Sequence, residues 1–391
     1  MSQFLSKRVS NYELFFDLAV VLAIGQLTSA IHLNHIGLQE VLAFITTNII
    51  IFNIWHNEVL YFNKYGDSRL QDIYTIIALM FIVGNISLNF SLNIKGYYAG
   101  NPQLMLFNFL LMLFNFLLML AYAFIALQYF LKGKKLGFSH NIKLSILSQL
   151  SYSLPLAGLA LGLLPLNIWT ALIYLLPNLL PIFSRKFYNH QLVNFPHIVE
   201  RLHLVTLLTF GESVIAIIKT YPLKDQPLTG FMLFFGMATL FVFYMGQTFL
   251  NINHHQETTA SILFYAHLPI FAGINIFTVG IEFLAESHHA NIGFILFLAG
   301  IISFYLGVLA TSRYNKDLYR FDLKAWLQYS CTILTGFILM ILLKSHLIFL
   351  ALILVLQNRL MMRINMANRH RARERHNVPH PDPSKNFRDF S

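Results

Sequence analysis

The feature that most constrains this chain is a succession of apolar segments, each close to the roughly 20 residues that a helix needs to cross a bilayer. Only 11% of the residues are charged, whereas soluble proteins carry about 25%. Such a chain cannot cover a water-facing surface, so the sequence predicts an all-α, polytopic integral membrane protein with about twelve transmembrane helices. The predicted spans are residues 12–33, 38–62, 71–94, 104–131, 142–164, 167–184, 198–219, 228–251, 260–284, 291–311, 324–345 and 346–362.

Basic residues gather in alternate loops of this arrangement, as expected when the cytoplasmic loops carry the excess of Lys and Arg. With the amino terminus inside, the outside loops hold only Lys95, Lys219, Lys224 and Lys344. The inside segments hold Lys7, Arg8, Lys64, Arg69, Lys132, Lys134, Lys135, Arg185, Lys186, Arg313, Lys316, Arg320, Lys324 and the tail from Arg359 onward. The asymmetry predicts that both termini are cytoplasmic.

The two halves of the chain resemble each other. A constant shift along the sequence lays Gly25-Gln26 on Gly211-Glu212 and carries the first four predicted spans onto the seventh to tenth. An even number of spans per half gives both halves the same orientation, so we expect two parallel six-helix repeats, residues 1–187 and 188–362. Repeats of this kind are common in transporters, whose sites lie between the halves.

The carboxy-terminal tail, residues 363–391, is rich in Arg and then in Pro. Because it lacks the apolar residues needed for a core, we predict a disordered segment. Its basic residues favour anionic lipid headgroups as partners, at about 1 kcal/mol each. No aromatic residue for base stacking is interleaved with the arginines at 369–375, so nucleic acid is not expected as a partner.

Two segments place charged residues within apolar helices. A charged side chain in a bilayer is energetically costly, so such residues usually face the protein interior or a water-filled cavity. The first contains Glu13 and Asp17, which are spaced i, i+4 and share one helix face. They indicate either a point where a cation or proton enters, or a helix amino terminus stabilised by negative charge. The second segment contains Glu200, Arg201, His203 and Glu212.

Glu212 lies about fourteen residues into its span, or roughly 20 Å at 1.5 Å per residue. An unpaired carboxylate there costs about 2.5–3.5 kcal/mol, so it takes up a proton or meets a partner. In the repeat its counterpart is Gln26, and a hydrogen bond between the two would be purely structural. The same shift relates Asp17 to His203, which would allow them to share a proton.

Metal, cofactor and enzyme signatures are not evident. His203 and His267 each lie in an apolar helix, where a single histidine is more often structural than a ligand. His254-His255 and His288-His289 fall in loops predicted on opposite sides of the membrane and cannot form one site. No phosphate-binding loop, nucleophile elbow or zinc helix motif is found. We therefore expect no metal, no cofactor and no catalytic residues.

Three stretches resemble the signatures of the bacterial low temperature requirement protein A family. They are Glu13-Leu14-Phe15-Phe16-Asp17-Leu18, then Glu200-Arg201-x-x-Leu204 ending in Gly211-Glu212-Ser213, and Ala266-His267-Leu268-Pro269 with Gly273 and Gly280-Ile281-Glu282. The second span departs from the pattern with Trp55-His56-Asn57-Glu58, where the family would have more tryptophan and no acid. The resemblance implies a multi-pass protein of the bacterial cytoplasmic membrane associated with growth in the cold, and it implies no particular reaction.

The residues leave three functional hypotheses open. The first is a transporter or channel-like protein, in which Asp17, Arg201, His203 and Glu212 line a polar pathway that couples protons to a small solute. The second is a non-transporting membrane scaffold or cold-adaptation factor, which would bury the same residues in a closed cluster. The third, for which no motif argues, is a membrane enzyme acting on lipid.

Overall fold

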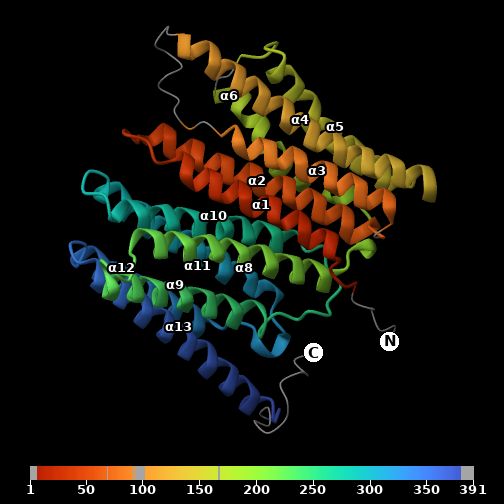
Figure 1. Cartoon of the computed structure of the whole chain (residues 1–391). Coiled ribbons are helices and arrows are strands. Elements are labelled where there is room, and N and C mark those ends of the chain that lie inside the picture. The colour runs from red at the N-terminus through yellow and green to blue at the C-terminus, as the bar shows by residue number, and fades with distance from the viewer. Residues whose placement is uncertain (1–6, 68, 91, 93–101, 166–167, 380–391) are drawn as a thin grey trace. The chain divides into compact units, whose positions relative to one another are not determined.

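The computed structural model describes residues 7–67, 69–90, 92, 102–165 and 168–379 (Figure 1). Its regular elements in these residues are all helical, and ten of the helices are long and apolar enough to cross a membrane. The predicted all-α, polytopic membrane architecture is therefore confirmed. The chain divides into two compact units: an N-terminal unit of Met1–Val205 with Glu257–Ala260, and a C-terminal unit of Thr206–Gln256 with Ser261–Ser391.

The N-terminal unit is built around α2. Its elements are α1 (Asn11–Ala30), α2 (Leu38–Tyr65), α3 (Leu70–Leu88), α4 (Pro102–Leu136), α5 (His140–Ala160), α6 (Ile168–Ala171), α7 (Leu176–Ser184) and the first part of α8 (Phe195–Thr220). Helix α1 packs on α2 and α3, and α4 packs on α2, α3 and α5 (Figure 1). Trp55, Tyr61 and Phe62 of α2 are fully buried in this unit, which makes α2 its central helix.

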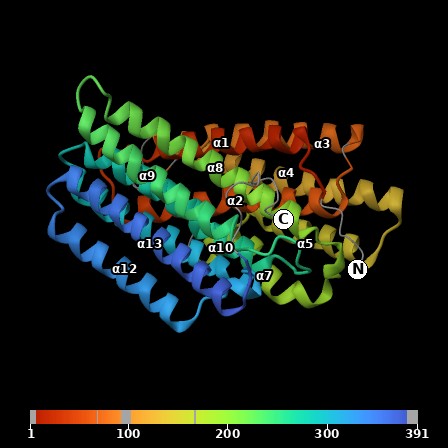
Figure 2. The ribbon, with the colours of Figure 1, turned by 90° about the horizontal axis from the view of Figure 1, so that it is seen from below.

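The C-terminal unit contains the rest of α8 together with α9 (Pro227–Thr248), α10 (Ser261–Leu284), α11 (Ala290–Ala310), α12 (Leu323–Leu342) and α13 (Leu347–Arg375). Helix α13 packs on α9 and α12 (Figure 2). Glycines bring α10 and α11 into close contact, because a Cβ on Gly280 would lie 2.4 Å from the Phe297 nitrogen and a Cβ on Gly300 would lie 2.4 Å from the Phe277 nitrogen. Small residues at helix crossings permit this approach in membranes.

Two predicted spans differ from the rest in the structure. The fifth corresponds to α5, which is outside the ten apolar helices because its buried face carries Asn141, Ser145, Gln149 and Ser153. The sixth is broken into α6, a 3-10 turn at Leu172–Leu175 and α7. Pro177 lies in the first turn of α7, where a proline without a backbone N–H is tolerated, whereas in the middle of a continuous helix it would remove a hydrogen bond. The count of twelve and the parallel repeat stay predictions.

The last helix is longer than expected. Helix α13 continues to Arg375, whereas the predicted span ends at 362 and the following residues were expected to be disordered. Arg373 Nε donates a hydrogen bond to the Tyr319 hydroxyl at 2.8 Å, and the Arg369 guanidinium lies 4.9 Å from the centre of the same ring. Docking on Tyr319 and the good helix propensity of arginine account for the extension. The rest of the predicted tail, from residue 380, lies outside the described residues.

Candidate functional site

Helix α2 carries a polar face into the core of the N-terminal unit and forms side-chain hydrogen bonds with five of the helices around it. The bonds run from Trp55 Nε1 to Asp17 Oδ1 of α1 (2.8 Å), from Tyr61 OH to Asp72 Oδ1 of α3 (2.6 Å), from Gln128 Nε2 of α4 to Glu58 Oε1 (2.9 Å), from Gln149 Nε2 of α5 to Asn57 Oδ1 (2.7 Å), and in both directions between Asn53 and Asn178 of α7 (2.7 and 3.0 Å). Polar contacts therefore fix the orientation of this helix.

A buried ion pair joins α1 to α8 within this unit. Arg201 Nη2 donates to Asp17 Oδ1 at 2.7 Å, and Arg201 Nε lies 3.9 Å from Glu13 Oε2. Trp55 donates to the same Asp17 oxygen, and its ring centre is 5.9 Å from the guanidinium. All four side chains are at most 1% exposed. Their charges therefore interact in a dry environment, where electrostatic forces are far stronger than in water.

Glu13 has two roles at the start of α1. Its Oε1 accepts from the Ser10 backbone nitrogen at 3.1 Å, while the Glu13 nitrogen donates to Ser10 Oγ at 3.3 Å, which forms a capping box. Its Oε2 lies 3.0 Å from His197 Nε2. Because Asn63 Nδ2 lies 3.1 Å from His197 Nδ1 and an amide NH₂ can only donate, Nδ1 is the acceptor.

Glu58 belongs to the same cluster. It is three residues after Trp55 and therefore on the same face of α2, it is 1% exposed, and it interacts electrostatically with Arg201 and Glu13. We call Glu13, Asp17, Glu58, His197 and Arg201 the charged core. Glu13 and Asp17 thus share one guanidinium, Glu13 also meets one histidine, and Glu58 is the third buried carboxylate of the group.

Several polar atoms of the charged core are unpaired. Among the described residues, the atoms of the charged core that are buried without a hydrogen-bond partner are Glu13 Oε2, Asp17 Oδ2, Glu58 Oε2, His197 Nε2, and Arg201 Nε and Nη1. A buried group left unsatisfied costs about 1–3 kcal/mol, and more when it is charged. Such atoms in a native core point to a bound proton, water or ion.

A second ion pair lies beside the C-terminal end of α2. Lys132 Nζ is 3.1 Å from Asp72 Oδ2 and 3.3 Å from Asp67 Oδ1. Asp72 and Lys132 are buried, whereas the Asp67 side chain is 34% exposed in the loop between α2 and α3. Partial burial favours a raised pKa for Asp67, but its contacts with Asp72 and Lys132 hold that pKa down to about 2.

A polar chain connects Glu58 to this second pair. Gln128 Nε2 donates to Glu58 Oε1 and also to Thr75 Oγ1 at 3.2 Å, and Thr75 Oγ1 donates to the Asp72 carbonyl at 3.1 Å. Through Lys132 the chain ends at the partly exposed Asp67. Polar groups thus lead from the buried carboxylate of Glu58 to the surface.

The structure separates the sequence-predicted residues into groups. Glu13, Asp17 and Arg201 come together as described. Gln26, His203 and Glu212 are half-buried, and Glu200 is exposed. His267 is buried in the C-terminal unit, where its Nδ1 lies 2.8 Å from the Leu263 carbonyl and its Nε2 lies 3.0 Å from the Tyr244 hydroxyl. A carbonyl can only accept, so Nδ1 donates, Nε2 accepts from Tyr244, and both ring nitrogens are satisfied.

Sequence reasoning missed the other members of the cluster. His197 could have been found, because it stands i, i+4 to Arg201 on the face that pairs with Glu13 and Asp17. Glu58 was visible as an acid inside an apolar span. Gln128 and Lys132 carried no signal of this kind, since only tertiary packing brings α4 against α2.

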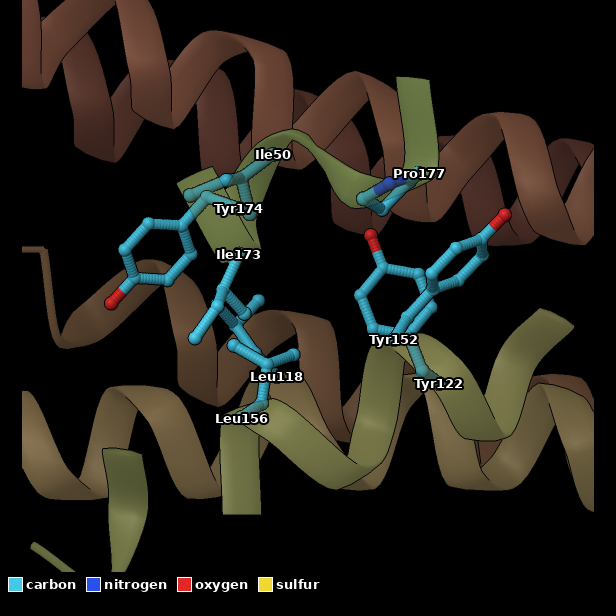
Figure 3. Close-up of a pocket in the computed structure, with 8 residues that line it drawn as sticks. All are labelled: Ile50, Leu118, Tyr122, Tyr152, Leu156, Ile173, Tyr174 and Pro177. Atoms are coloured by element: carbon cyan, nitrogen blue, oxygen red, sulfur yellow. The ribbon is translucent and has the colours of Figure 1, made fainter. Parts of the chain in front are cut away.

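A small pocket in the N-terminal unit is separate from the charged core (Figure 3). Its internal volume is about 10 Å³, close to the minimum for one water molecule. In Figure 3 the rings of Tyr122 and Tyr152 lie together on one side of it, while Leu118 and Ile173 lie on the other. The Tyr174 hydroxyl donates to Asn115 Oδ1 at 2.7 Å. The pocket is too small and too apolar for a polar solute.

Comparison with known proteins agrees with the three sequence signatures. The family model described as "Bacterial low temperature requirement A protein (LtrA)" matches residues 8–362, nearly the whole chain. No curated protein matches the chain significantly.

Proposed function

The chain belongs to the bacterial low temperature requirement A family, and on that premise we propose that it is a proton-coupled transporter or channel-like protein that supports growth in the cold. It resides in the bacterial cytoplasmic membrane with both termini inside. The charged core of the N-terminal unit is its proton site, and a small solute is its cargo.

The observation that carries this proposal is the charge imbalance of the core. Glu13, Asp17 and Glu58 are three buried carboxylates. The cations that interact with them are the buried guanidinium of Arg201 and the half-buried amine of Lys7, which interacts with Glu13. A core built only for stability would match its charges, because an uncompensated buried charge costs several kcal/mol. Protons bound to the surplus carboxylates remove this cost. A site that binds protons to stay neutral is suited to proton coupling when those protons exchange.

The polar chain from Glu58 to Asp67 supplies a route to one membrane surface. It ends beside Lys132, Lys135 and Arg69, which the distribution of basic residues predicts to be cytoplasmic. We propose that these polar groups mark the side from which water reaches Glu58 and takes up its proton, so that the proton leaves toward the cytoplasm. Breaking the Asp72–Lys132 pair would open the route to water.

The half-buried residues are further polar candidates, each taken within its own unit. Gln26 and His203 belong to the N-terminal unit and Glu212 to the C-terminal unit. Glu212 is the proton candidate of that unit, as its depth in the span suggests. We assign it a role secondary to Glu58, because the charged core contains the uncompensated carboxylates.

A membrane scaffold is the second candidate, and one observation favours it. The charged core is almost completely buried, and its ion pair joins two helices as a structural clamp would. In a scaffold the imbalance would be neutralised permanently, and no residue of the cluster would need to release a proton. The two functions therefore differ in whether the proton exchanges.

Proton flux distinguishes them. The full chain is reconstituted into liposomes that contain a pH-sensitive dye, and a membrane potential is imposed with potassium and valinomycin. We expect the wild type to change the pH of the lumen. Glu58→Gln keeps the size and hydrogen bonding of the side chain but should lower the rate of proton flux at least about tenfold, which corresponds to about 1.4 kcal/mol in the barrier.

Glu40→Gln is the matched control, because Glu40 is also buried on α2 and its Oε2 only caps the helix by accepting from the Gly37 nitrogen at 2.8 Å. Its flux should equal that of the wild type. A wild type without flux, or a Glu58→Gln variant with full flux, would favour the scaffold.

A further inference from the structure

The loop between α10 and α11 brings together three metal-binding side chains that no part of the proposed function uses. Glu286, His288 and His289 each offer one ligand atom, and these three atoms all lie within 4.8 Å of one another. The loop lies between two candidate membrane spans, Ser261–Leu284 and Ala290–Tyr314, and is therefore outside the membrane-spanning helices. We propose that it forms a binding site for a divalent transition metal ion of the zinc type.

The chemistry of the donors selects this class of metal. Two imidazoles with one carboxylate suit Zn²⁺, Ni²⁺, Cu²⁺ and Co²⁺, whereas Mg²⁺ and Ca²⁺ prefer sites made of oxygen atoms alone. Three protein ligands with water in the fourth position is a common zinc arrangement. Bonds of about 2.0–2.2 Å place the ligand atoms of a tetrahedral site roughly 3.3 Å apart. The observed spacing reaches this value with side-chain rotation alone, for which the exposed His288 is free.

Two of the ligands are already held close together. His289 Nδ1 lies 2.6 Å from Glu286 Oε2. The ring of His289 packs against Phe283 at 5.2 Å and against the His288 ring at 4.6 Å between centroids. Because a metal ion replaces the proton shared by imidazole and carboxylate, this pair is a preformed half of the site.

The backbone of the loop is equally well fixed. Glu286 N donates to the Phe283 carbonyl at 3.1 Å, His289 N to the Glu286 carbonyl at 3.0 Å, and Gly293 N to the His289 carbonyl at 2.8 Å. Gly293 allows α11 to approach the end of α10, since a Cβ there would lie 2.8 Å from the Leu284 nitrogen. A loop between two tightly packed helices holds its ligands in place before the metal arrives, which lowers the entropic cost of binding.

Sequence reasoning did not find this site, because it compared His288-His289 only with the other histidine doublet. The third ligand, Glu286, comes from the same loop and is brought close by consecutive turns. The proposal is independent of proton coupling, and the charged core shares no residue with it. The predicted topology places the loop outside the cytoplasm.

The test uses the full chain in detergent, purified without a histidine tag. Co²⁺ is titrated first, because a tetrahedral cobalt site absorbs visible light, and Zn²⁺ is then added to displace it. We expect one ion per chain. His288→Gln and Glu286→Gln should each weaken binding by at least about tenfold, since even residues supporting a metal ligand are worth 10–100-fold.

Two controls test whether the other histidine doublet binds the metal and whether the ligand variants still fold. His254→Gln combined with His255→Gln should leave cobalt binding unchanged. Zn²⁺ should raise the melting temperature of the wild type and of this control but not of the two ligand variants. Since His288 is exposed, its variant should melt like the wild type without metal. Absence of a tetrahedral cobalt spectrum, equal binding by His288→Gln and Glu286→Gln, or loss of binding in the control would each overturn the proposal.

Discussion

The two units of this protein solve the same problem, a polar interior in a membrane, in different ways. Every buried Asp, Glu, Lys and Arg in the described part of the chain belongs to the N-terminal unit. They are Glu13, Asp17, Glu40, Glu58, Asp72, Lys132 and Arg201. The interior of the C-terminal unit is neutral, with amide, hydroxyl and imidazole side chains between its helices.

Hydrogen bonds between amide side chains join parts of the neutral interior. Gln247 Nε2 donates to Asn315 Oδ1 at 2.8 Å, and Asn251 Nδ2 is shared between Gln247 and Asn365 at 2.8 Å each. Such bonds join membrane helices at about 0.6 kcal/mol each. Burying a charged group in a membrane protein costs far more free energy than burying a neutral one, so buried charges are found mainly at functional sites. We infer that the C-terminal unit is mainly a framework and that the proton chemistry proposed above belongs to the N-terminal unit.

Removing the buried cation should have the largest effect. Arg201→Met leaves Asp17 and Glu13 without their guanidinium and should lower the free energy of unfolding by about 3–5 kcal/mol. Chemical unfolding in detergent measures the loss. The double variant with Asp17→Asn should recover part of it, because one stranded charge is then gone. An equal loss in the single and double variants would contradict the ion-pair account.

A matched pair of hydroxyl deletions compares the two units directly. Tyr61→Phe removes a 2.6 Å bond to the Asp72 carboxylate and should cost about 1.5–3 kcal/mol. Tyr305→Phe removes a 2.8 Å bond to the neutral Asn358 Oδ1 and should cost about 0.6 kcal/mol. Both tyrosines are buried. Equal costs, measured in the same unfolding experiment, would remove the energetic distinction between the units.

The C-terminal unit should be more sensitive to close packing than to the loss of a hydrogen bond. Gly280→Ala places a methyl group 2.4 Å from the Phe297 nitrogen and should destabilise by about 1–3 kcal/mol. Gly84→Ala in α3 is the control, since no atom lies within 4 Å of its added Cβ, and helix propensity favours alanine by up to about 1 kcal/mol. Similar melting temperatures for the two variants would show that α10 and α11 do not pack this closely.

The smallest expected effect is an acid dependence at the Asp67 end of the polar chain. The folded protein holds the pKa of Asp67 at about 2, below the unfolded value of about 3.9. A lowered pKa stabilises the fold above pH 4, and this contribution is lost as the pH falls toward 2. Asp67→Asn should therefore reduce the fall in the free energy of unfolding between pH 4 and pH 2. Asp225→Asn, at an exposed site, is the control, and an unchanged fall in Asp67→Asn would exclude the assignment.

The sequence predicted most of the fold and half of the site, for identifiable reasons. Long apolar windows and the cost of charge in a bilayer located the helices and pointed to Glu13, Asp17 and Arg201. Neither rule could find Gln128 or Trp55, because their roles depend on which helices touch. Hydropathy also could not predict that the sixth span is broken near Pro177 or that α13 extends to Arg375. One follows from proline geometry and the other from contacts with Tyr319.

The most direct test of the central claim is the protonation state of the charged core. Infrared spectroscopy of the full chain at neutral pH detects an uncharged carboxylic acid by its carbonyl stretch, which shifts in heavy water. The account predicts such a band in the wild type, its loss in Glu58→Gln, and its persistence in the matched control Glu40→Gln. A wild-type spectrum without a protonated carboxyl group, or an unchanged band in Glu58→Gln, would contradict it.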